Sequence, residues 1–536
     1  MSGRRAPTRA PKPKRPSRAR PAAAEAPAVA VKQRGARGRS PRAPGARRAN
    51  IWAALRRVPV AAWVCALVAC LNAVCWSIIM PPFQVPDEQD HFAYVQELAE
   101  SGHIPIPQRE AVYSPEETFA LQDLEYYNLR RYPQSHAISS IKQQQRLQSD
   151  LSKPLPRRGN GGAGVATSQP PLYYALQTIP YAFESGGTIL ARLQLMRLLS
   201  TVLAGLTALF VFLFVREALP GAPWAWTVGG LGVALAPLPA FISGGVNPDA
   251  LLYAISAASF YCLARGFHRG LTPRLGAAIG ALIILGLLTK LNFIGLTPGI
   301  VLGAIVLTIR QARVSRRIAL RSFALAVGVP AVPVFLYVAF KTLSGNPTVS
   351  LASSAINSTL HGPDKMRELG YIWQLYLPRL PGMANDFIGL FPSRQIWFNG
   401  LVGLYGWFDT SFPSWVYGAA ILPASIIAAL VIRALVVCRA ALRRRLAELV
   451  VYLSITFGLM LLIGAASYVY FSTKNSGGSP EARYLMPLLA LWGAVLALAA
   501  RGAGRRWEPA AGVLIVVLFL AHDIFSQLLV ISRYYG

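Results

Sequence analysis

Long apolar runs alternate with short basic segments along most of the chain. Eleven of these runs approach the length of about 20 residues that a helix needs to cross a bilayer. The pattern therefore predicts an all-α polytopic membrane protein with about eleven transmembrane helices. The predicted spans lie at residues 58–80, 196–215, 224–243, 249–264, 275–289, 292–309, 322–340, 413–432, 446–471, 484–500 and 509–530.

Arginine residues between the spans orient the predicted helices, because basic residues accumulate in cytoplasmic loops. With the amino terminus inside, every short inner loop is basic, and 34 of the 53 Lys and Arg residues lie in these loops and the amino-terminal tail. Two long segments, residues 81–195 and 341–412, then lie outside, and the first contains 12 of the 23 acidic residues. We therefore expect a binding or active site on the outer face, with residues 531–536 as a short outer carboxy-terminal segment.

Composition excludes a water-soluble single-domain enzyme, since 54% of the residues are apolar, 14% are charged and the mean hydropathy is +0.40. The net charge of +30 is concentrated in residues 1–57, which hold 17 basic residues and one acidic residue. This tail is rich in Arg, Pro, Ala, Gly and Ser, so we expect it to be disordered and to contact anionic inner-leaflet lipid. No nucleic-acid partner is expected.

An acidic cluster follows the first predicted span. Asp87, Glu88, Asp90 and His91 lie within five residues, just beyond the membrane interface. In a helix that begins at Asp87, the side chains of Asp87, Asp90, His91 and Tyr94 share one face. Such a face could hold a general base, a divalent cation such as Mg²⁺ or Mn²⁺, or both. The alternative is structural: Asp87 caps the helix and Asp90 is its partner in the first turn.

Two cations are predicted at the outer ends of spans, where basic residues are disfavoured. Lys290 lies between two apolar runs, and either a functional role or a snorkelling side chain explains it. The Arg483 guanidinium suits a phosphate or diphosphate, although Glu481 could simply pair with it. Asp249 begins the span after a tight outer turn, and helix capping explains it adequately.

The segment from Gln169 to Tyr174 contains a proline pair followed by two tyrosines. It predicts a helix at the outer membrane interface, with an aromatic belt as the simpler explanation of the tyrosines. The five cysteines lie within or beside apolar spans, which predicts neither disulfides nor a zinc site. Arg outnumbers Lys by 44 to 9, a bias typical of GC-rich bacterial genomes.

Six short motifs, taken in order, resemble a bacterial family of predicted membrane proteins that looks like part of the GT-C glycosyltransferase superfamily. Protein O-mannosyltransferases and aminoarabinose transferases belong to that superfamily. The resemblance covers residues 58–530. The motifs are Asp87-Glu88, Gln169 to Tyr174, Asn247 to Ala250, Leu288 to Lys290, Tyr405 to Asp409, and Arg483-Tyr484.

The resemblance implies a GT-C-like enzyme of the bacterial plasma membrane that moves a sugar from a polyprenyl-phosphate carrier to an envelope glycan or protein. It implies that Asp87 and Glu88 are catalytic, and that Lys290 and Arg483 bind the carrier phosphate. Juxtamembrane helices of the long first outer loop would frame the site. By their helical spacing, Asp90 and His91 are possible orienting residues or metal ligands.

The sequence ends without a large soluble carboxy-terminal domain, so acceptor recognition is expected from segments 81–195 and 341–412. Two other functions stay open. One is a transporter or flippase of lipid-linked sugars, although no internal repeat is visible and the ionisable residues cluster outside the spans. The other is a non-catalytic scaffold of an envelope-polysaccharide assembly.

Overall fold

The computed structural model describes residues 56–105, 113–138, 140–159, 164–343, 365–473 and 479–536. The basic tail at residues 1–57, expected to be disordered and to contact lipid, lies outside the described residues except for its last two arginines. Residues Val58–Gly536 form one unit, in which helices predominate. The strands of the described residues form one short hairpin, β1 (Leu404–Tyr405) with β2 (Thr410–Ser411).

Nine helices in the described residues are long and apolar enough to cross a membrane. Two of them are composite: Arg316–Leu336 runs through α14, η2 and into α15, and Ala482–Gly502 runs through η5 and α22. The elements of this set are α2 (Val60–Ile79), α8 (Ile189–Ala218), α11 (Asp249–Arg269), α13 (Phe293–Ala312), α14 (Arg316–Phe323), η2 (Ala324–Gly328), α15 (Val329–Leu343), α19 (Ser414–Val437), α21 (Leu446–Thr473), η5 (Ala482–Leu488), α22 (Leu489–Gly502) and α23 (Glu508–Tyr535).

The other two predicted spans are less regular. Residues 224–243 form α9 (Pro223–Ala234) and α10 (Pro237–Ser243), which are bent by 56° at the break between them. Pro237 begins α10 and cannot donate the backbone hydrogen bond that would continue α9. The remaining predicted span is α12 (Pro273–Thr289), an apolar helix of 17 residues. Every predicted span therefore coincides with a helix or a broken helix pair, which confirms the all-α polytopic fold class.

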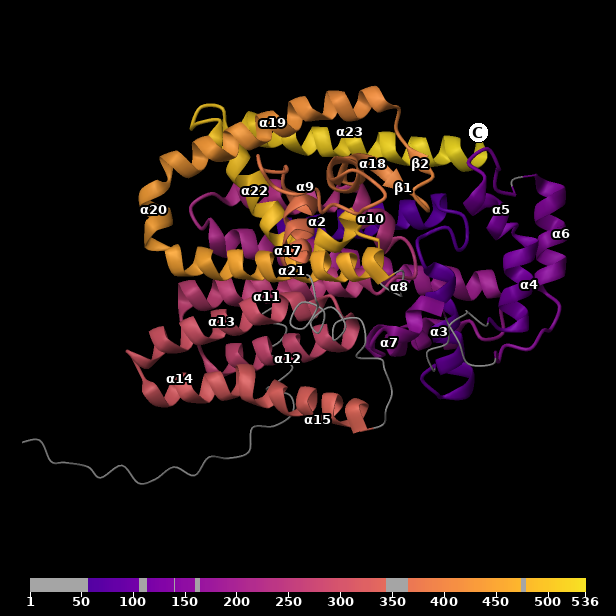
Figure 1. Cartoon of the computed structure of the whole chain (residues 1–536), viewed down its shortest axis with the longest axis horizontal. Helices are drawn as coiled ribbons and strands as arrows, with labels where there is room; N and C mark the ends of the chain where they lie inside the picture. Colours follow the sequence, from indigo (N-terminus) through magenta and orange to yellow (C-terminus); the bar gives the residue numbers. More distant parts are fainter. Residues whose placement is uncertain (1–55, 106–112, 139, 160–163, 344–364, 474–478) are drawn as a thin grey trace, which may run out of the picture. The chain divides into compact units, whose positions relative to one another are not determined.

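Helix α8 packs against both α2 and α11 (Figure 1), and α8 and α11 are the most buried of the apolar spans. Glycines allow two further helix pairs to approach closely. A Cβ atom at Gly229 of α9 would lie 2.6 Å from the carbonyl oxygen of Gly493 in α22, and Gly458 of α21 similarly abuts the Gly295 carbonyl of α13. Small residues at such contacts favour helix association in membranes.

The first outer segment folds as a group of shorter helices, coloured indigo to purple in Figure 1. The second outer segment continues from α15 to α19 and carries the hairpin. The first group comprises α3 (Glu88–Ser101), α4 (Pro115–Asp123), α5 (Tyr126–Arg131), α6 (Ile141–Leu151), η1 (Gly164–Ser168) and α7 (Leu172–Phe183). The second comprises α17 (Lys365–Tyr376), η4 (Gln395–Asn399) and α18 (Gly400–Gly403), and α20 (Arg439–Arg444) joins α19 to α21.

Helix α7 begins directly after the proline pair, as the sequence predicts. It buries Tyr173 and Tyr174 against the bundle, while Ile179 is 54% and Phe183 is 80% exposed. An apolar face that stays exposed is typical of a helix at a membrane interface. The tyrosines do not form an exposed belt, because both are fully buried.

Candidate active site

Asp87 occupies the N-cap position of α3, but its side chain does not cap that helix. Its backbone is left-handed, with φ of 63°, a conformation that Asp and Asn adopt more readily than most residues. Its carboxylate turns instead toward Arg483, whose Nη2 donates to Oδ2 at 2.9 Å. The capping explanation of Asp87 is therefore wrong, because the carboxylate is used in a contact with a distant part of the chain.

Arg483 lies at the start of η5 and is only 5% exposed. Its Nη2 also donates to Oε1 of Glu481 at 3.3 Å, and its Nε lies 2.5 Å from Oε2 of that carboxylate. The pairing of Glu481 with Arg483, which the sequence left open as an alternative, is thus observed. The buried Nη1 has no hydrogen-bond partner among the described residues. A buried guanidinium nitrogen without an acceptor is costly, so this atom is a natural contact for an anionic ligand.

Lys290 is buried beside this cluster, and its Nζ lies 2.7 Å from Oδ1 of Asp249. Capping does not explain Asp249, because Pro248 occupies the N-cap position of α11 and the Asp249 side chain makes this ion pair. The ring of Tyr484 lies near both cations, with its centroid 5.6 Å from Nζ of Lys290 and 5.3 Å from the guanidinium carbon of Arg483. The structure therefore brings together both cations predicted from the sequence, and a snorkelling Lys290 is excluded.

Glu88 is placed differently from Asp87. It is fully buried, and its carboxylate accepts hydrogen bonds from Nε and Nη2 of Arg197 at 2.8 and 2.5 Å. The backbone N–H of Val246 donates to the same carboxylate at 2.9 Å. These contacts tie the start of α3 to α8 and to the turn before α11, so Glu88 holds the backbone that presents Asp87.

Asp90 and His91 point to other partners on the outer helices. Tyr113 donates its hydroxyl to Oδ1 of Asp90 at 2.7 Å, and Nδ1 of His91 lies 3.0 Å from the hydroxyl of Tyr174 on α7. The ring of Tyr94 stacks on that of Tyr174, with centroids 3.7 Å apart. Helix α7 thus frames the acidic cluster, as expected of a juxtamembrane helix.

The acidic cluster does not suit a divalent metal. Within the part of the chain that the structure describes, no group of three or more His, Cys, Asp or Glu side chains could hold a metal ion. Carboxylate-rich ligand sets are what Mg²⁺ and Mn²⁺ require.

The electrostatic environments of the two carboxylates that share Arg483 differ. Burial opposes ionisation of Asp87, but the positive charges of Arg483 and Lys290 outweigh it and hold the pKa of Asp87 below its ordinary value. Burial raises the pKa of Glu481 to about 7, because Arg483 offsets it only in part. Burial also lowers the pKa of His91 to about 3, so this imidazole is neutral at neutral pH.

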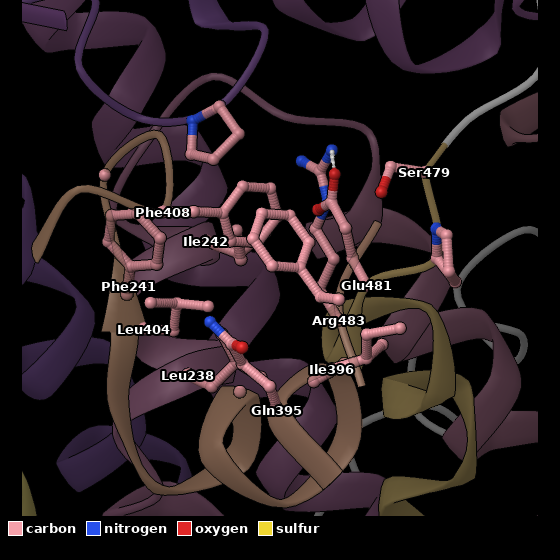
Figure 2. A pocket seen from close by; sticks show the side chains of 16 residues that line it. Leu238, Phe241, Ile242, Gln395, Ile396, Leu404, Phe408, Ser479, Glu481 and Arg483 are labelled. Carbon is pink, nitrogen blue, oxygen red and sulfur yellow. Dashed lines mark hydrogen bonds and ion pairs between the residues drawn. The ribbon is translucent and has the colours of Figure 1, made fainter. Parts of the chain in front are cut away.

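A pocket adjoins this cluster and encloses about 660 Å³, including space open to solvent. Figure 2 shows Glu481 and Arg483 side by side, with Phe241, Leu404 and Phe408 on another wall of the pocket. The apolar walls come from α10, η4, α18 and the hairpin, and the charged wall comes from residues 479–483. The lining residues are Pro86, Leu238, Phe241, Ile242, Phe391, Gln395, Ile396, Gly400, Leu404, Gly406, Phe408 and Ser479 to Arg483.

The hairpin wall is held by an arginine near the end of α23. Arg533 donates to Oδ2 of Asp409 at 3.0 Å and to the backbone carbonyls of Leu129, Tyr132 and Ser135 at 3.0, 3.2 and 2.6 Å. It therefore joins the hairpin to the first outer segment.

The apolar walls of the pocket could not be predicted from the sequence. Phe241 and Ile242 lie within a predicted span, where a pocket-facing residue has the same apolar character as one that faces lipid. Phe408 is 43% exposed and has a left-handed backbone with φ of 67°, an outlier for a bulky residue. Gly406, which also has a positive φ, was a possible turn signal in the Tyr405 to Asp409 motif.

A family model described as "Predicted membrane protein (DUF2142)" matches residues 70–492. This stretch runs from within α2 to within α22, and it contains Asp87, Lys290 and Arg483. The chain belongs to the DUF2142 family. The family resemblance expected from the motifs is thus confirmed. No curated protein matches the DUF2142 chain.

Two solved membrane proteins are similar to the DUF2142 chain at a low level. The oligosaccharyltransferase of Archaeoglobus fulgidus, in its apo form, is 13% identical with a TM-score of 0.38, over 89% of this chain and 56% of that protein. ArnT from Cupriavidus metallidurans, in the apo state, is 16% identical with a TM-score of 0.33, over 82% of this chain and 77% of that protein. The DUF2142 chain thus spans little more than half the length of the oligosaccharyltransferase.

Proposed function

We propose that the protein is a membrane glycosyltransferase that moves a sugar from a polyprenyl-phosphate carrier to an acceptor of the cell envelope. The observation that carries this proposal is the Arg483 guanidinium. It is buried beside an apolar pocket, next to a partly exposed carboxylate, and its Nη1 lacks an acceptor among the described residues. This arrangement offers one binding contact for an anion and one base beside a surface that suits a lipid chain.

The pocket fits the two parts of such a donor. Phe241, Ile242 and Leu404 give an apolar wall for the isoprene units next to the phosphate, and Arg483 lies where that phosphate would end. A guanidinium binds phosphate oxygens through directed hydrogen bonds and stabilises the charge that develops on a leaving phosphate. Lys290 adds positive charge nearby, although Asp249 neutralises much of it.

Asp87 is the proposed base. An acceptor hydroxyl has a pKa far above neutrality, so its attack on the anomeric carbon needs a positioned proton acceptor. Because the pKa of Asp87 is held below its ordinary value, the carboxylate is ionised at neutral pH. Its side chain is 26% exposed, which leaves it accessible from the outer side. Glu88 acts as a positioning residue in this proposal, because Arg197 and Val246 occupy its carboxylate.

The location of the reaction and the binding of the acceptor follow from the same proposal. We place the reaction at the outer face of a bacterial plasma membrane, with the amino terminus in the cytoplasm and the acceptor bound by the outer segments 81–195 and 341–412. The exposed ring of Phe408 at the pocket is suited to stack against a sugar. The basic tail would add contact with anionic lipid.

The test is an Asp87→Asn variant. Asn tolerates the left-handed backbone of this position and keeps the size of the side chain, but it removes the base. Envelope glycans from cells lacking the gene, complemented with wild type or with the variant, are compared by mass analysis. The variant should fold normally and lower the rate of transfer roughly 100-fold or more. Glu508→Gln, at the start of α23 and outside both outer segments, also removes one carboxylate; it is the control and should behave as wild type.

Two results would count against the proposal. If deletion of the gene changes no envelope glycan, the protein has no role in glycan transfer. If a well-folded Asp87→Asn protein restores the normal glycan, Asp87 is not the base, and transport of a lipid-linked sugar becomes the better explanation.

A further inference from the structure

The charges around Arg483 do not favour an additional anion. Its guanidinium is shared by the carboxylates of Asp87 and Glu481, and the neighbouring Lys290 and Asp249 form a neutral ion pair. With both carboxylates ionised, this set of five side chains has a net charge of −1. A phosphodiester would add another negative charge in a place where burial makes repulsion strong. A site for a phosphate therefore has to lose one negative charge when the ligand binds.

We propose that the donor phosphate binds at Nη1 of Arg483 together with one proton carried by Glu481, which then passes this proton to the departing phosphate. This inference rests on the proposed glycosyl transfer and adds a second catalytic residue to it. Glu481 is suited by position because it lines the pocket beside Arg483, whereas Asp87 is not among the lining residues. Its side chain is also the more buried of the two, 14% exposed against 26% for Asp87.

The charges that face Glu481 support the same division of roles. Burial and the negative charge of Asp87 oppose ionisation of Glu481, while Arg483 and Lys290 favour it. The combined effect of burial and Asp87 is larger than that of the two cations. The pKa of Glu481 is thus raised to about 7 while that of Asp87 is lowered. Two carboxyl groups whose environments separate their pKa values in this way are suited to act as one acid and one base.

The resulting transfer balances in atoms and charge. The acceptor oxygen forms a bond to the anomeric carbon, and its proton passes to Asp87. The bond between the anomeric carbon and the phosphate oxygen breaks, and its electron pair stays on that oxygen. Glu481 gives its proton to the phosphate, which leaves as a monoanionic monoester. Exchange with water on the outer side then moves one proton from Asp87 and returns one to Glu481.

The inference predicts how binding depends on pH. Below pH of about 7, Glu481 is already protonated in the free protein, so ligand binding needs no further proton. Above that pH, each bound ligand must bring one proton with it. The affinity should therefore be constant at lower pH and fall about tenfold per pH unit above neutrality.

The experiment measures proton uptake by isothermal titration calorimetry of the full chain in nanodiscs at pH 8. The probe is farnesyl methyl phosphate, a diester that keeps a single negative charge between pH 5 and 9. Titrations in two buffers with different ionisation enthalpies give the number of protons bound per ligand. We expect about one proton for wild type and none for Glu481→Gln, whose affinity should also be independent of pH. Glu125→Gln, at an exposed position, is the matched control and should take up one proton.

Each other outcome overturns the inference in a distinguishable way. Binding to wild type without proton uptake contradicts the role of Glu481 but leaves the donor site intact. Uptake that persists in Glu481→Gln assigns the proton to a different group. If wild type does not bind the probe at any pH between 5 and 9, both the inference and the proposed donor site fail. A well-folded Glu481→Gln protein with unchanged turnover would show that the proton is not used in the transfer step.

Discussion

Glu117 on α4 is a carboxyl group with an unusual environment. Its side chain is fully buried, and neither oxygen has a hydrogen-bond partner among the described residues. Burial, together with the negative charges of Asp90 and Glu116, raises its pKa well above the ordinary value. Such a group is stable in the folded protein only when it carries its proton.

Replacing Glu117 by Gln should make stability less dependent on pH. The unfolded chain releases this proton near the ordinary pKa of 4.5, whereas the folded protein keeps it to a much higher pH. The folded state therefore binds more protons, and wild type loses up to about 1.4 kcal/mol of stability per pH unit above that value. In thermal unfolding in detergent, the melting temperature of Glu117→Gln should rise relative to that of wild type as the pH increases from 5 to 8. A difference in melting temperature that stays constant over this range would contradict the assignment.

The site could be predicted residue by residue, but its contacts could not. Asp87, Lys290 and Arg483 stand out in the sequence because charged groups are costly at membrane boundaries. The pairing of Asp87 with Arg483 joins residues 396 positions apart, and no local pattern encodes such a contact. The cap explanation of Asp87 failed for the same reason, since capping is inferred from neighbours in sequence whereas the side chain turns to η5.

At the scale of elements, the buried pair of Arg197 and Glu88 joins the outer helices to the membrane bundle. Arg197 on α8 also donates to the backbone carbonyls of Ser77, Met80 and Pro81, at the end of α2 and just after it. One side chain thus fixes how the chain leaves the first span and where α3 begins. Removing one partner of a buried ion pair leaves the other charge uncompensated, which is strongly destabilising.

We predict that Glu88→Ala lowers stability by about 3–5 kcal/mol. Arg197→Ala should lower stability by more than Glu88→Ala, because it also leaves three backbone carbonyls without their hydrogen-bond donor. The double variant should lose less than the sum of the two single losses, since neither charge is then left unpaired. Thermal unfolding of the three variants in nanodiscs measures these differences. Additive losses would mean that the two side chains do not stabilise the fold through each other.

The spans themselves were predictable because apolar length is a local property of the sequence. All eleven predicted runs coincide with helices, including the broken pair α9 and α10 and the short helix α12. The bend of 56° between α9 and α10 was not predicted. Pro237 marks its position, but the run around it is as apolar as an unbroken span.

At the scale of the whole molecule, the helices divide the chain between two sides of the membrane. Three membrane-spanning elements, α21, the η5–α22 run and α23, separate Arg445 from Gly536. An odd number of crossings places these two positions on opposite sides. Because basic residues accumulate in cytoplasmic loops, the arginines around α20 predict that Arg445 lies on the cytoplasmic side.

Reporter fusions test this arrangement. A fluorescent reporter that matures only in the cytoplasm should be bright after Arg445 and dark after Gly536. Alkaline phosphatase, which is active only outside, should give the reverse result at the same positions. The same reporter responding at both positions would mean that one of the three helices does not cross the membrane.

The junction at Arg533 has a consequence for biosynthesis. Translation makes Leu129 and Tyr132 early, Asp409 much later and Arg533 later still, yet this arginine contacts all three. A nascent chain that has inserted most of its helices therefore still lacks the Arg533 contacts that hold the hairpin wall of the pocket. The hairpin wall of the pocket can therefore reach its final position only after the ribosome has added residue 533.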